Sequence, residues 1–341
     1  MGTVLVTGGA GYIGSHTVKA LLAADREVVV LDNLSAGHRD SVQDVRLVEA
    51  DVGDVDVVQS VLRDYNVTAV MHFAAVLSVG ESVKDPQRYY STNVVSTISL
   101  LQAMKEESVS HFIFSSSAAV YGAPTQLPIR ESHPLVPVNP YGSSKLVIEQ
   151  ALQHYAHAYE LSFISLRYFN AAGADPDGKI GEDHRPEIHV IPKAIVAAQE
   201  GLEFEIFGDD YATSDGTCVR DYVHVSDVAD AHVLALRAIE GGVKSSVYNV
   251  GTGTPHSVRQ VVASVERVTG KAVACAICDR RSGDPPVLYA SSERFLSELG
   301  WKPRFGDIDE IVDTAWRWHL SHPNGYEASL DSRTSGPIKT L

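Results

Sequence analysis

The sequence predicts an α/β fold built on a doubly wound parallel sheet, with a smaller α/β domain interleaved with it. Short apolar segments typical of strands alternate with helical segments over the first half of the chain, and the first strand runs into a glycine-rich turn. Strands separated by helices pair in parallel because each helix carries the chain back across the sheet. At 341 residues the chain exceeds the size at which one apolar core usually stops growing, so we expect two domains.

The first element is an apolar, β-branched strand over residues 3–7, which ends in three spaced glycines, Gly8, Gly11 and Gly14. Residues 15–24 follow with the apolar periodicity of a helix. Because glycines lack side chains, the backbone can turn tightly and approach a pyrophosphate, whose charge the helix N-terminus stabilises. We therefore expect a nucleotide cofactor at this turn.

A second apolar strand, residues 28–31, ends at Asp32, which lies 18 residues after Gly14. A carboxylate there accepts hydrogen bonds from adenosine ribose hydroxyls and repels a 2′-phosphate, so it favours NAD over NADP. The alternative is a loop aspartate that only caps the next segment. The strand, the glycine turn and Asp32 together predict a Rossmann-type fold that binds NAD.

The alternation of strands and helices continues to residue 166. We expect strands at 45–49, 68–73, 111–114 and 161–166, and helices at 54–65, 87–106 and 144–159. Ala74 and Ala75 follow the second of these strands, and such small residues leave room for a cofactor to pass. Asn93 lies inside the second helix, and three serines ending at Ser117 follow the third strand.

The second half departs from this rhythm. After residue 170 we expect loops and one helix at 192–200, and then a strand at 219–225, a helix at 227–240 and a strand at 246–250. We assign residues 1–170 plus about 221–250 to the NAD-binding domain, and about 171–220 plus 251–322 to a substrate domain. Residues 323–341 show no periodicity and are expected to form a loose tail.

Tyr141 and Lys145 are the candidate reactive pair. They are four residues apart, so on a helix they project from one face. An ammonium beside a phenol favours the phenolate and lowers the tyrosine pKa from its ordinary value of about 10, which would make Tyr141 a base for a sugar hydroxyl. Ser117, at a strand's carboxyl end, could share that proton. The alternatives are an exposed helix face for the pair and a simple turn for the serines.

Composition and charge exclude several classes of protein. The net charge of −15, from 28 basic and 43 acidic residues, argues against a nucleic-acid or anionic-membrane partner. No run approaches eighteen apolar residues and no signal segment precedes the first strand, so we expect a cytoplasmic protein without a membrane partner. Cys275 and Cys278 form a CxxC, but no second pair completes a metal set and the surrounding residues indicate a buried strand. No metal is therefore expected.

Several sequence segments, taken in order, resemble those of one known family. The segments TGGAGYIGSH, LDNLSAG, FAA…VGES, FIFSSSAAVYG, NPYGSSK and LRYFNAAGA occur in this order, followed by FGDDYATSDGTCVRDYVHVSDVADAH, YNVGTG, RRSGD and LGW. They resemble the UDP-glucose (UDP-galactose) 4-epimerases of the extended short-chain dehydrogenase/reductase family over about residues 4–322. The resemblance implies an NAD-dependent epimerase of UDP-sugars that works as a homodimer, paired through the helices that carry Met104 and Tyr159.

The resemblance also assigns roles residue by residue. It implies catalytic roles for Ser117, Tyr141 and Lys145. It implies cofactor contacts at Gly8, Gly11, Tyr12, Ile13, Gly14, Asp32, Asn33, Leu34, Ser35, Gly37, Asp51, Val52, Phe73, Ala74, Ala75, Asn93, Ser115, Tyr141, Lys145, Tyr168 and Phe169. It implies substrate contacts at Ser117, Tyr141, Asn170, His189, Val190, Phe207, Arg220, Tyr222, Arg281 and Asp284.

The chemistry of the substrate set fits a nucleoside diphosphate sugar. Arg220 and Arg281 could each fork onto the diphosphate, and Asp284 could accept from a ribose hydroxyl. Phe207 could lie against the uracil ring. The alternatives are surface ion pairs for the arginines and a core position for the phenylalanine.

Related enzymes with other activities carry different residues at particular positions. Sugar-nucleotide 4,6-dehydratases carry an Asp-Glu pair directly after the hydroxyl residue, where this chain has Ala118-Ala119. A non-catalytic NAD-binding protein is disfavoured because Ser117, Tyr141 and Lys145 are all present. We expect interconversion of UDP-glucose and UDP-galactose by transient oxidation at C4.

Two departures from the family pattern keep other UDP-sugars open. This chain lacks the lysine that many members carry near Leu77, a feature similar to the UDP-xylose/UDP-arabinose 4-epimerases. Leu288 stands where some epimerases have a bulky tyrosine, and a smaller side chain could admit the N-acetyl group of UDP-N-acetylglucosamine. His189 stands where some members have asparagine.

Overall fold

The larger part of the molecule is a seven-stranded parallel sheet with the order β10-β6-β5-β4-β1-β2-β3. The computed structural model describes residues 2–281 and 284–326. The strands are β1 (Thr3–Thr7), β2 (Val28–Asp32), β3 (Arg46–Glu49), β4 (Val67–His72), β5 (His111–Ser117), β6 (Ser162–Tyr168) and β10 (Ser246–Val250). The predicted doubly wound sheet is confirmed, and its order reverses between β1 and β4.

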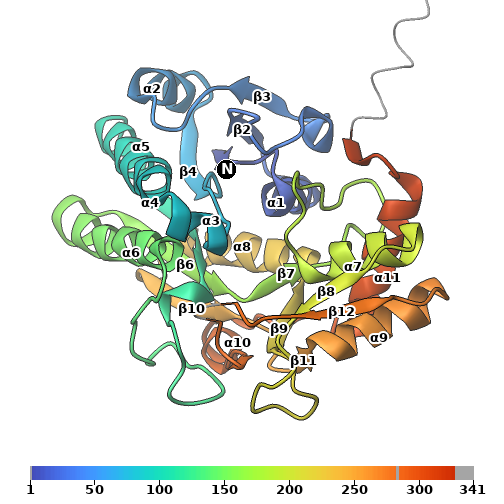
Figure 1. Ribbon diagram of the computed structural model, residues 1–341. Helices are drawn as coiled ribbons and strands as arrows, with labels where there is room; N and C mark the ends of the chain where they lie inside the picture. The colour runs from blue at the N-terminus through green and yellow to red at the C-terminus, as the bar shows by residue number, and fades with distance from the viewer. Residues whose placement is uncertain (1, 282–283, 327–341) are drawn as a thin grey trace, which may run out of the picture.

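Helices cover both faces of this sheet (Figure 1). One face packs on α1 (Tyr12–Ala23) and α8 (Val225–Glu240), and the other on α2 (Val55–Asp64), α5 (Ser96–Glu106) and α6 (Pro140–Tyr159). The side chains of β1 alternate between the two cores, with Val4 and Val6 in one and Leu5 in the other. All three are fully buried, as expected for a parallel strand covered on both sides.

The predicted helix over residues 87–106 is interrupted. It consists of α4 (Pro86–Tyr89), a π-helical segment η2 (Tyr90–Val95) and α5, and a further short helix, α3 (Val79–Lys84), precedes it. Asn93 lies in the π-helical segment. Its side chain accepts a hydrogen bond from the Val76 N–H at 2.9 Å and donates one to the Val76 carbonyl at 3.0 Å. The irregular turn thus ties the helix to the chain that leaves β4.

A second, smaller layer carries the rest of the chain. A four-stranded sheet contains β7 (Asn170–Ala172), β9 (Val219–His224), β11 (Pro255–Ser257) and β13 (Val287–Leu288). A further pair is formed by β8 (Phe204–Phe207) and β12 (Cys275–Cys278). Helices α7 (Val190–Glu200), α9 (Val258–Thr269) and α11 (Ile308–Ser321) pack on these strands, as Figure 1 shows, and α10 (Glu293–Leu299) contacts β10. Two short 3₁₀ helices are η1 (Arg39–Val42) and η3 (Ala118–Val120).

Three expectations need correction. The stretch 171–217 holds β7 and β8 besides its one helix, because strands of three and four residues are too short to show periodicity. The strand β9 pairs in the smaller sheet, so residues 219–224 do not extend the large one. The CxxC lies on a strand, as expected, but Cys275 is exposed because β12 has β8 on only one side.

The division of the chain into two domains stays a prediction, and the predicted tail lies largely outside the described residues. Among those residues, no helix has both the length and the apolar character needed to cross a membrane.

Candidate active site

The glycine turn is fixed by close packing at Gly8 and Gly14, two of its three spaced glycines. A Cβ on Gly8 would lie 2.4 Å from the Ala74 nitrogen, and one on Gly14 would lie 2.2 Å from the Gly8 carbonyl oxygen. Gly8 also has a φ of +70°, which disfavours other residues. A Cβ on Gly11 would meet only the Gly8 oxygen, at 3.4 Å. The protein's own packing therefore does not require a glycine at Gly11, whereas a phosphate lying against the backbone there would.

The N-terminus of α1 faces this open position. Gly11 is its N-cap, and no side chain caps the helix there. The first N–H groups of α1 and its positive end can therefore stabilise a pyrophosphate. The turn lies at the carboxyl ends of β1 and β4, where the strand order reverses and where open α/β sheets bind their ligands. The residues present fit NAD.

Asp32 is the residue predicted to bind the adenosine ribose. It ends β2 and is 7% exposed, with Oδ2 accepting from the Ala10 N–H at 3.0 Å and Oδ1 from the Leu34 N–H at 2.9 Å. Burial raises the pKa of this carboxyl. Each oxygen keeps a further lone pair that a ribose hydroxyl can use. The backbone bonds therefore fix the carboxylate in place without using up its acceptors.

The remaining predicted cofactor residues surround this position. The loop after Asp32 carries Asn33, Leu34, Ser35 and Gly37, and the Asn33 amide donates to Asp51 at 3.1 Å. Val52 is buried beside Asp51. After β4, the N–H groups of Phe73 and Ala74 both donate to the Thr7 carbonyl, at 2.8 and 3.1 Å, and Ala75 follows. Tyr12 and Ile13 lie in the first turn of α1. The structure brings these segments together at one edge of the sheet.

The reactive end of the site lies where β5 and α6 meet. Ser117 ends β5, and α6 begins at Pro140, so Tyr141 lies in its first turn. The Asn139 side chain caps the helix by accepting from the Gly142 N–H at 2.9 Å. A Cβ on Gly142 would lie 2.4 Å from the Ala119 carbonyl oxygen, so the helix start packs directly on the chain that follows Ser117. This close approach brings the Tyr141 side chain beside Ser117, whose hydroxyl lowers the Tyr141 pKa.

Lys145 lies one turn after Tyr141, as its spacing predicts. It is 4% exposed, and its Nζ donates to the Ser115 carbonyl at 2.9 Å and lies 5.9 Å from the centre of the Tyr141 ring. Burial lowers the pKa of Lys145 to about 8, and nearby Glu149 opposes this shift.

The expected effect of Lys145 on Tyr141 is not what the structure shows. Burial raises the pKa of Tyr141, and the neighbouring Ser117 hydroxyl is what opposes this rise. The ammonium is directed at a backbone carbonyl rather than at the phenol oxygen, which explains the difference. In this arrangement Ser117 is the residue that favours the phenolate.

Sequence reasoning missed a buried ionic network beneath this pair. Glu149, one turn after Lys145, is 1% exposed and accepts from Ser116 Oγ at 2.5 Å. Arg167 donates to both oxygens of Glu149, at 2.9 and 2.5 Å. The signal in the sequence was the glutamate four residues after Lys145, on the helix face that also carries Ile148 and Leu152. A buried carboxylate there keeps Lys145 protonated more readily than burial alone would allow.

The chain leads directly from β6, at the predicted cofactor site, into β7 of the four-stranded sheet. Ser115 Oγ and the Tyr168 hydroxyl are hydrogen-bonded to each other at the ends of β5 and β6. Phe169 follows, and Asn170 starts β7, where it lies opposite Tyr222 of β9. The predicted contacts with cofactor and with substrate are thus adjacent in the chain.

Four of the predicted substrate residues form two pairs. Arg220 of β9 forms an ion pair with Asp284, and the two side chains are 12% and 30% exposed. The guanidinium of Arg281 lies 3.9 Å above the ring of Phe207. Val190 begins α7, one residue after His189. Nothing in these contacts distinguishes a ligand site from the simpler ion-pair alternative, so these assignments stay predictions.

His189 belongs to a cluster that sequence reasoning did not find. Its Nδ1 is hydrogen-bonded to the buried Glu182, and His184 and Glu187 complete the group. One ligand-type atom of each residue lies within 4.8 Å of the others. We interpret the group as an ion-pair cluster, because His189 and Glu182 contact each other directly and leave no room for an ion between them. The spacing Glu-x-His-x-x-Glu-x-His was the available signal.

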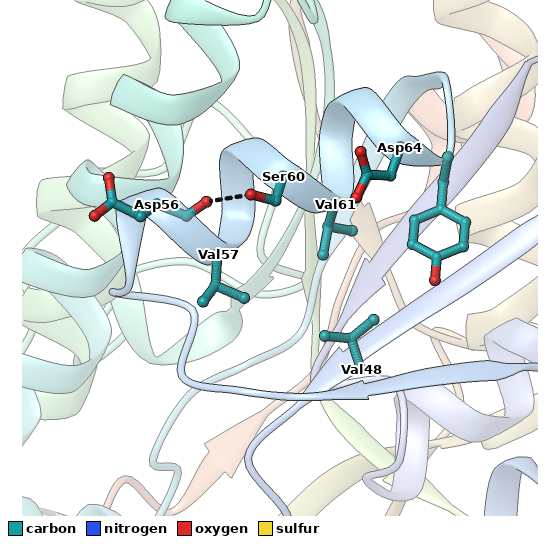
Figure 2. Close-up of a pocket in the computed structure, with 7 residues that line it drawn as sticks. Val48, Asp56, Val57, Ser60, Val61 and Asp64 are labelled. Carbon is teal, nitrogen blue, oxygen red and sulfur yellow. Dashed lines mark hydrogen bonds between the residues drawn. The ribbon is translucent and has the colours of Figure 1, made fainter.

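One surface hollow lies away from these residues. Figure 2 shows it between β3 and α2, where Ser60 Oγ donates to the Asp56 carbonyl at 2.9 Å. Its lining consists of Val48, Asp56, Val57, Ser60, Val61, Asp64 and Tyr65. None of these residues belongs to the predicted site. The hollow is therefore not where we place the chemistry.

Known proteins resemble this chain over nearly its whole length. The sequence pattern of the NAD dependent epimerase/dehydratase family matches residues 4–251. UDP-glucose 4-epimerase of Lacticaseibacillus casei is 49% identical over 326 residues, which cover 95% of this chain and 98% of the relative.

Solved structures agree with this result. The crystal structure of UDP-glucose 4-epimerase from Brucella ovis in complex with NAD has a TM-score of 0.90 at 48% identity, covering 93% of this chain and 98% of that one. The enzyme from Bifidobacterium longum in complex with NAD⁺ and UDP has a TM-score of 0.89 at 40% identity, covering 95% and 99%.

Proposed function

Because the chain belongs to the NAD dependent epimerase/dehydratase family, we propose that it acts as a UDP-glucose 4-epimerase, interconverting UDP-glucose and UDP-galactose. The observation that carries this proposal is the meeting of Ser117, Tyr141 and Lys145 at the sheet edge that holds the glycine turn. Relatives that carry the name UDP-glucose 4-epimerase match the chain over 95% of its length, which supports the same activity.

The residues divide the chemistry among them. When bound, NAD would supply a reversible acceptor for the C4 hydride. Return of this hydride to the opposite face of a transient 4-keto sugar inverts C4 without net oxidation. Tyr141 takes the proton of the C4 hydroxyl and gives it back. Ser117 lies beside the phenol, and its hydroxyl lowers the Tyr141 pKa and so stabilises the charged form. Lys145 holds a positive charge near the ring and fixes the Ser115 carbonyl.

Dehydration is disfavoured by the residues after Ser117. Elimination of water needs a proton donor beside the leaving hydroxyl, and sugar-nucleotide dehydratases carry carboxylates for it. Here these positions are Ala118 and Ala119, at the start of η3. A methyl group cannot donate a proton, so the intermediate has no route to water loss from this segment.

The deciding experiment is conversion without added cofactor. Purified protein is incubated with UDP-glucose, UDP-N-acetylglucosamine and UDP-xylose in separate tubes, and the anomeric protons are followed by NMR. We expect UDP-galactose to form from UDP-glucose. Failure to convert any of the three would contradict the epimerase assignment.

We also infer a homodimer that works in the cytoplasm. Apolar side chains are exposed along η2 and α6, with Val95 61% exposed and Tyr159 49% exposed, which supports pairing through these two elements. The three cysteines are free thiols, as is usual in a reducing compartment. Light scattering of the purified protein tests the dimer, and cell fractionation tests the location.

A further inference from the structure

The segment from Glu182 to His189 folds around one buried carboxylate. The Glu182 side chain is 4% exposed, and its partners are two imidazoles. His189 Nδ1 hydrogen-bonds Glu182 Oε1, and His184 Nδ1 lies 3.1 Å from the same oxygen. Glu187 completes the group by accepting from the backbone N–H groups of Ile188 and His189, at 2.7 and 2.8 Å. A buried carboxylate needs such partners, because an unpaired charge is costly in a low-dielectric interior.

His189 occupies a place that favours an anion. It is the N-cap of α7, a helix of 11 residues, and its side chain makes no capping bond. Since Nδ1 is held by Glu182, the ring presents Nε2 at its other edge, and the side chain remains 35% exposed. Burial lowers the pKa of His189, but the carboxylates of Glu182 and Glu187 outweigh burial and raise it. A charged imidazole at the positive end of a helix is a donor for an anionic oxygen.

The cluster lies between the two halves of the site. On the cofactor side, the rings of Tyr12 and His184 are 6.2 Å apart. On the other side, Ile191 packs in the same apolar cluster as Tyr222 of β9 and Ile206 of β8. These strands also carry Arg220 and Phe207. A molecule that reaches from the nicotinamide to these strands brings its diphosphate near this region.

We propose that Glu182 is a positioning residue, which holds His189 by Nδ1 so that Nε2 donates to the diphosphate of the UDP-sugar. This inference rests on the proposed function and adds the group that orients the substrate phosphates. Glu187 and His184 face His189, and Tyr12 and His319 face Glu182. Glu182 does not touch the substrate itself, and its effect passes through the imidazole.

The test compares Glu182→Gln, His189→Asn and the double variant with the unchanged protein. The KM for UDP-glucose is measured from pH 5.5 to 8.5. Without the carboxylate, His189 returns toward an ordinary pKa of about 6.5 and loses its charge as the pH rises. We therefore expect the KM of E182Q to rise about tenfold between these limits, with kcat within about twofold, while the KM of the unchanged protein stays level.

The other variants separate positioning from a merely structural role. H189N should raise the KM by about as much as E182Q does at pH 8.5, without dependence on pH, and E182Q should add nothing to it, because both act through one group. The matched control is His184→Gln, which removes the other imidazole and leaves the Glu182–His189 bond in place. Its KM should stay independent of pH. Bound NAD and thermal melting confirm that each variant is folded.

Three results would overturn the inference. They are a KM of E182Q that does not change with pH, additive effects in the double variant, and a KM that rises on EDTA treatment and recovers with Zn²⁺, which would make the cluster a metal site. Failure of the unchanged protein to convert any UDP-sugar would instead defeat the proposed function. The two failures are therefore distinguishable.

Discussion

The two halves of the candidate site are built by different means. At the cofactor edge, backbone groups and glycines set the geometry, since Gly8 and Gly14 pack within 2.4 Å of neighbouring backbone atoms when a Cβ is added. In the substrate half, charged side chains do so, through Arg220 with Asp284 and His189 with Glu182. Backbone packing changes little with pH and is disturbed by an added Cβ, whereas ion pairs respond to pH and to the loss of either charge. Binding of the cofactor and of the sugar nucleotide should therefore respond differently to mutation.

The largest expected effect is at the reacting group. Tyr141→Phe removes the proton acceptor and leaves the ring in place, so kcat for UDP-glucose should fall by about 10³-fold, within the usual range for a general base. Bound NAD should stay as in the unchanged protein, and HPLC of released nucleotide measures it. Near-normal kcat in Y141F would show that another residue takes the proton.

Two glycine variants test the cofactor half. Gly14→Ala places a Cβ 2.2 Å from the Gly8 oxygen and should lower both the melting temperature and the bound NAD. Gly11→Ala meets only that oxygen, at 3.4 Å, so its NAD-free form should melt as the NAD-free unchanged protein does, and yet it should bind less NAD. Fluorescence melting and nucleotide content are the readouts. Full NAD content in G11A would contradict the placement of the pyrophosphate at this turn.

The substrate half should instead respond in KM. Arg220→Met removes the charge that pairs with Asp284, and it should raise the KM for UDP-glucose by about 10- to 100-fold, the loss expected for a charge-assisted contact of about 1.5–3 kcal/mol. Bound NAD should not change. Steady-state kinetics with the NAD content measured in parallel makes the comparison, and a loss of NAD in R220M would break the contrast between the halves.

A pH-dependent effect is expected at Glu149. Its negative charge raises the pKa of Lys145, so Glu149→Gln should lower that pKa below its value of about 8. The ammonium is then lost at lower pH, and the alkaline limb of the kcat profile should move to lower pH by about one unit. The variant is assayed well below its melting temperature, because Arg167 loses its buried partner. An unmoved limb in folded E149Q would exclude Lys145 as its source.

The smallest effect concerns the choice of sugar. Leu288 packs against the cluster of Ala118 and Tyr121, close to Ser117. Leu288→Tyr fills this space and should lower turnover of UDP-N-acetylglucosamine severalfold relative to UDP-glucose, since excluding a small group from a pocket is worth about 1–3 kcal/mol. Competition between the two sugars in one NMR tube measures the ratio. An unchanged ratio would place the C2 substituent elsewhere.

The sequence could predict those parts of the candidate site that lie within a single strand, turn or helix. The spacing of Gly8, Gly11 and Gly14, the strand that ends at Asp32, and the helical spacing of Tyr141 and Lys145 each follow from the periodicity of one segment. Contacts between distant segments were not predictable in this way. Glu149 meets Arg167 across two elements, and the π-helical turn at Asn93 depends on its bonds to Val76.

The predicted lowering of the Tyr141 pKa was wrong because it too depended on a contact between distant segments. The spacing shows that Lys145 lies on the same helix face, but not that its ammonium is directed at Ser115. The cluster around Glu182 was missed because an irregular loop brings its residues together. In each case the missing information was the direction of a side chain, which tertiary packing decides.

The position of β10 at the edge of the large sheet affects how the protein folds during synthesis. β10 pairs with β6, and α8 covers one face of β1, β4 and β5, yet both elements follow residue 224. A nascent chain that has emerged only to residue 170 covers that face with α1 alone, without Val228, Leu236 and Tyr248 of the core. The cofactor half therefore cannot mature as an autonomous fragment during synthesis. The cofactor half is completed only by α8 and β10, which follow the first strands of the smaller layer. A chain truncated between residue 170 and α8 should therefore aggregate.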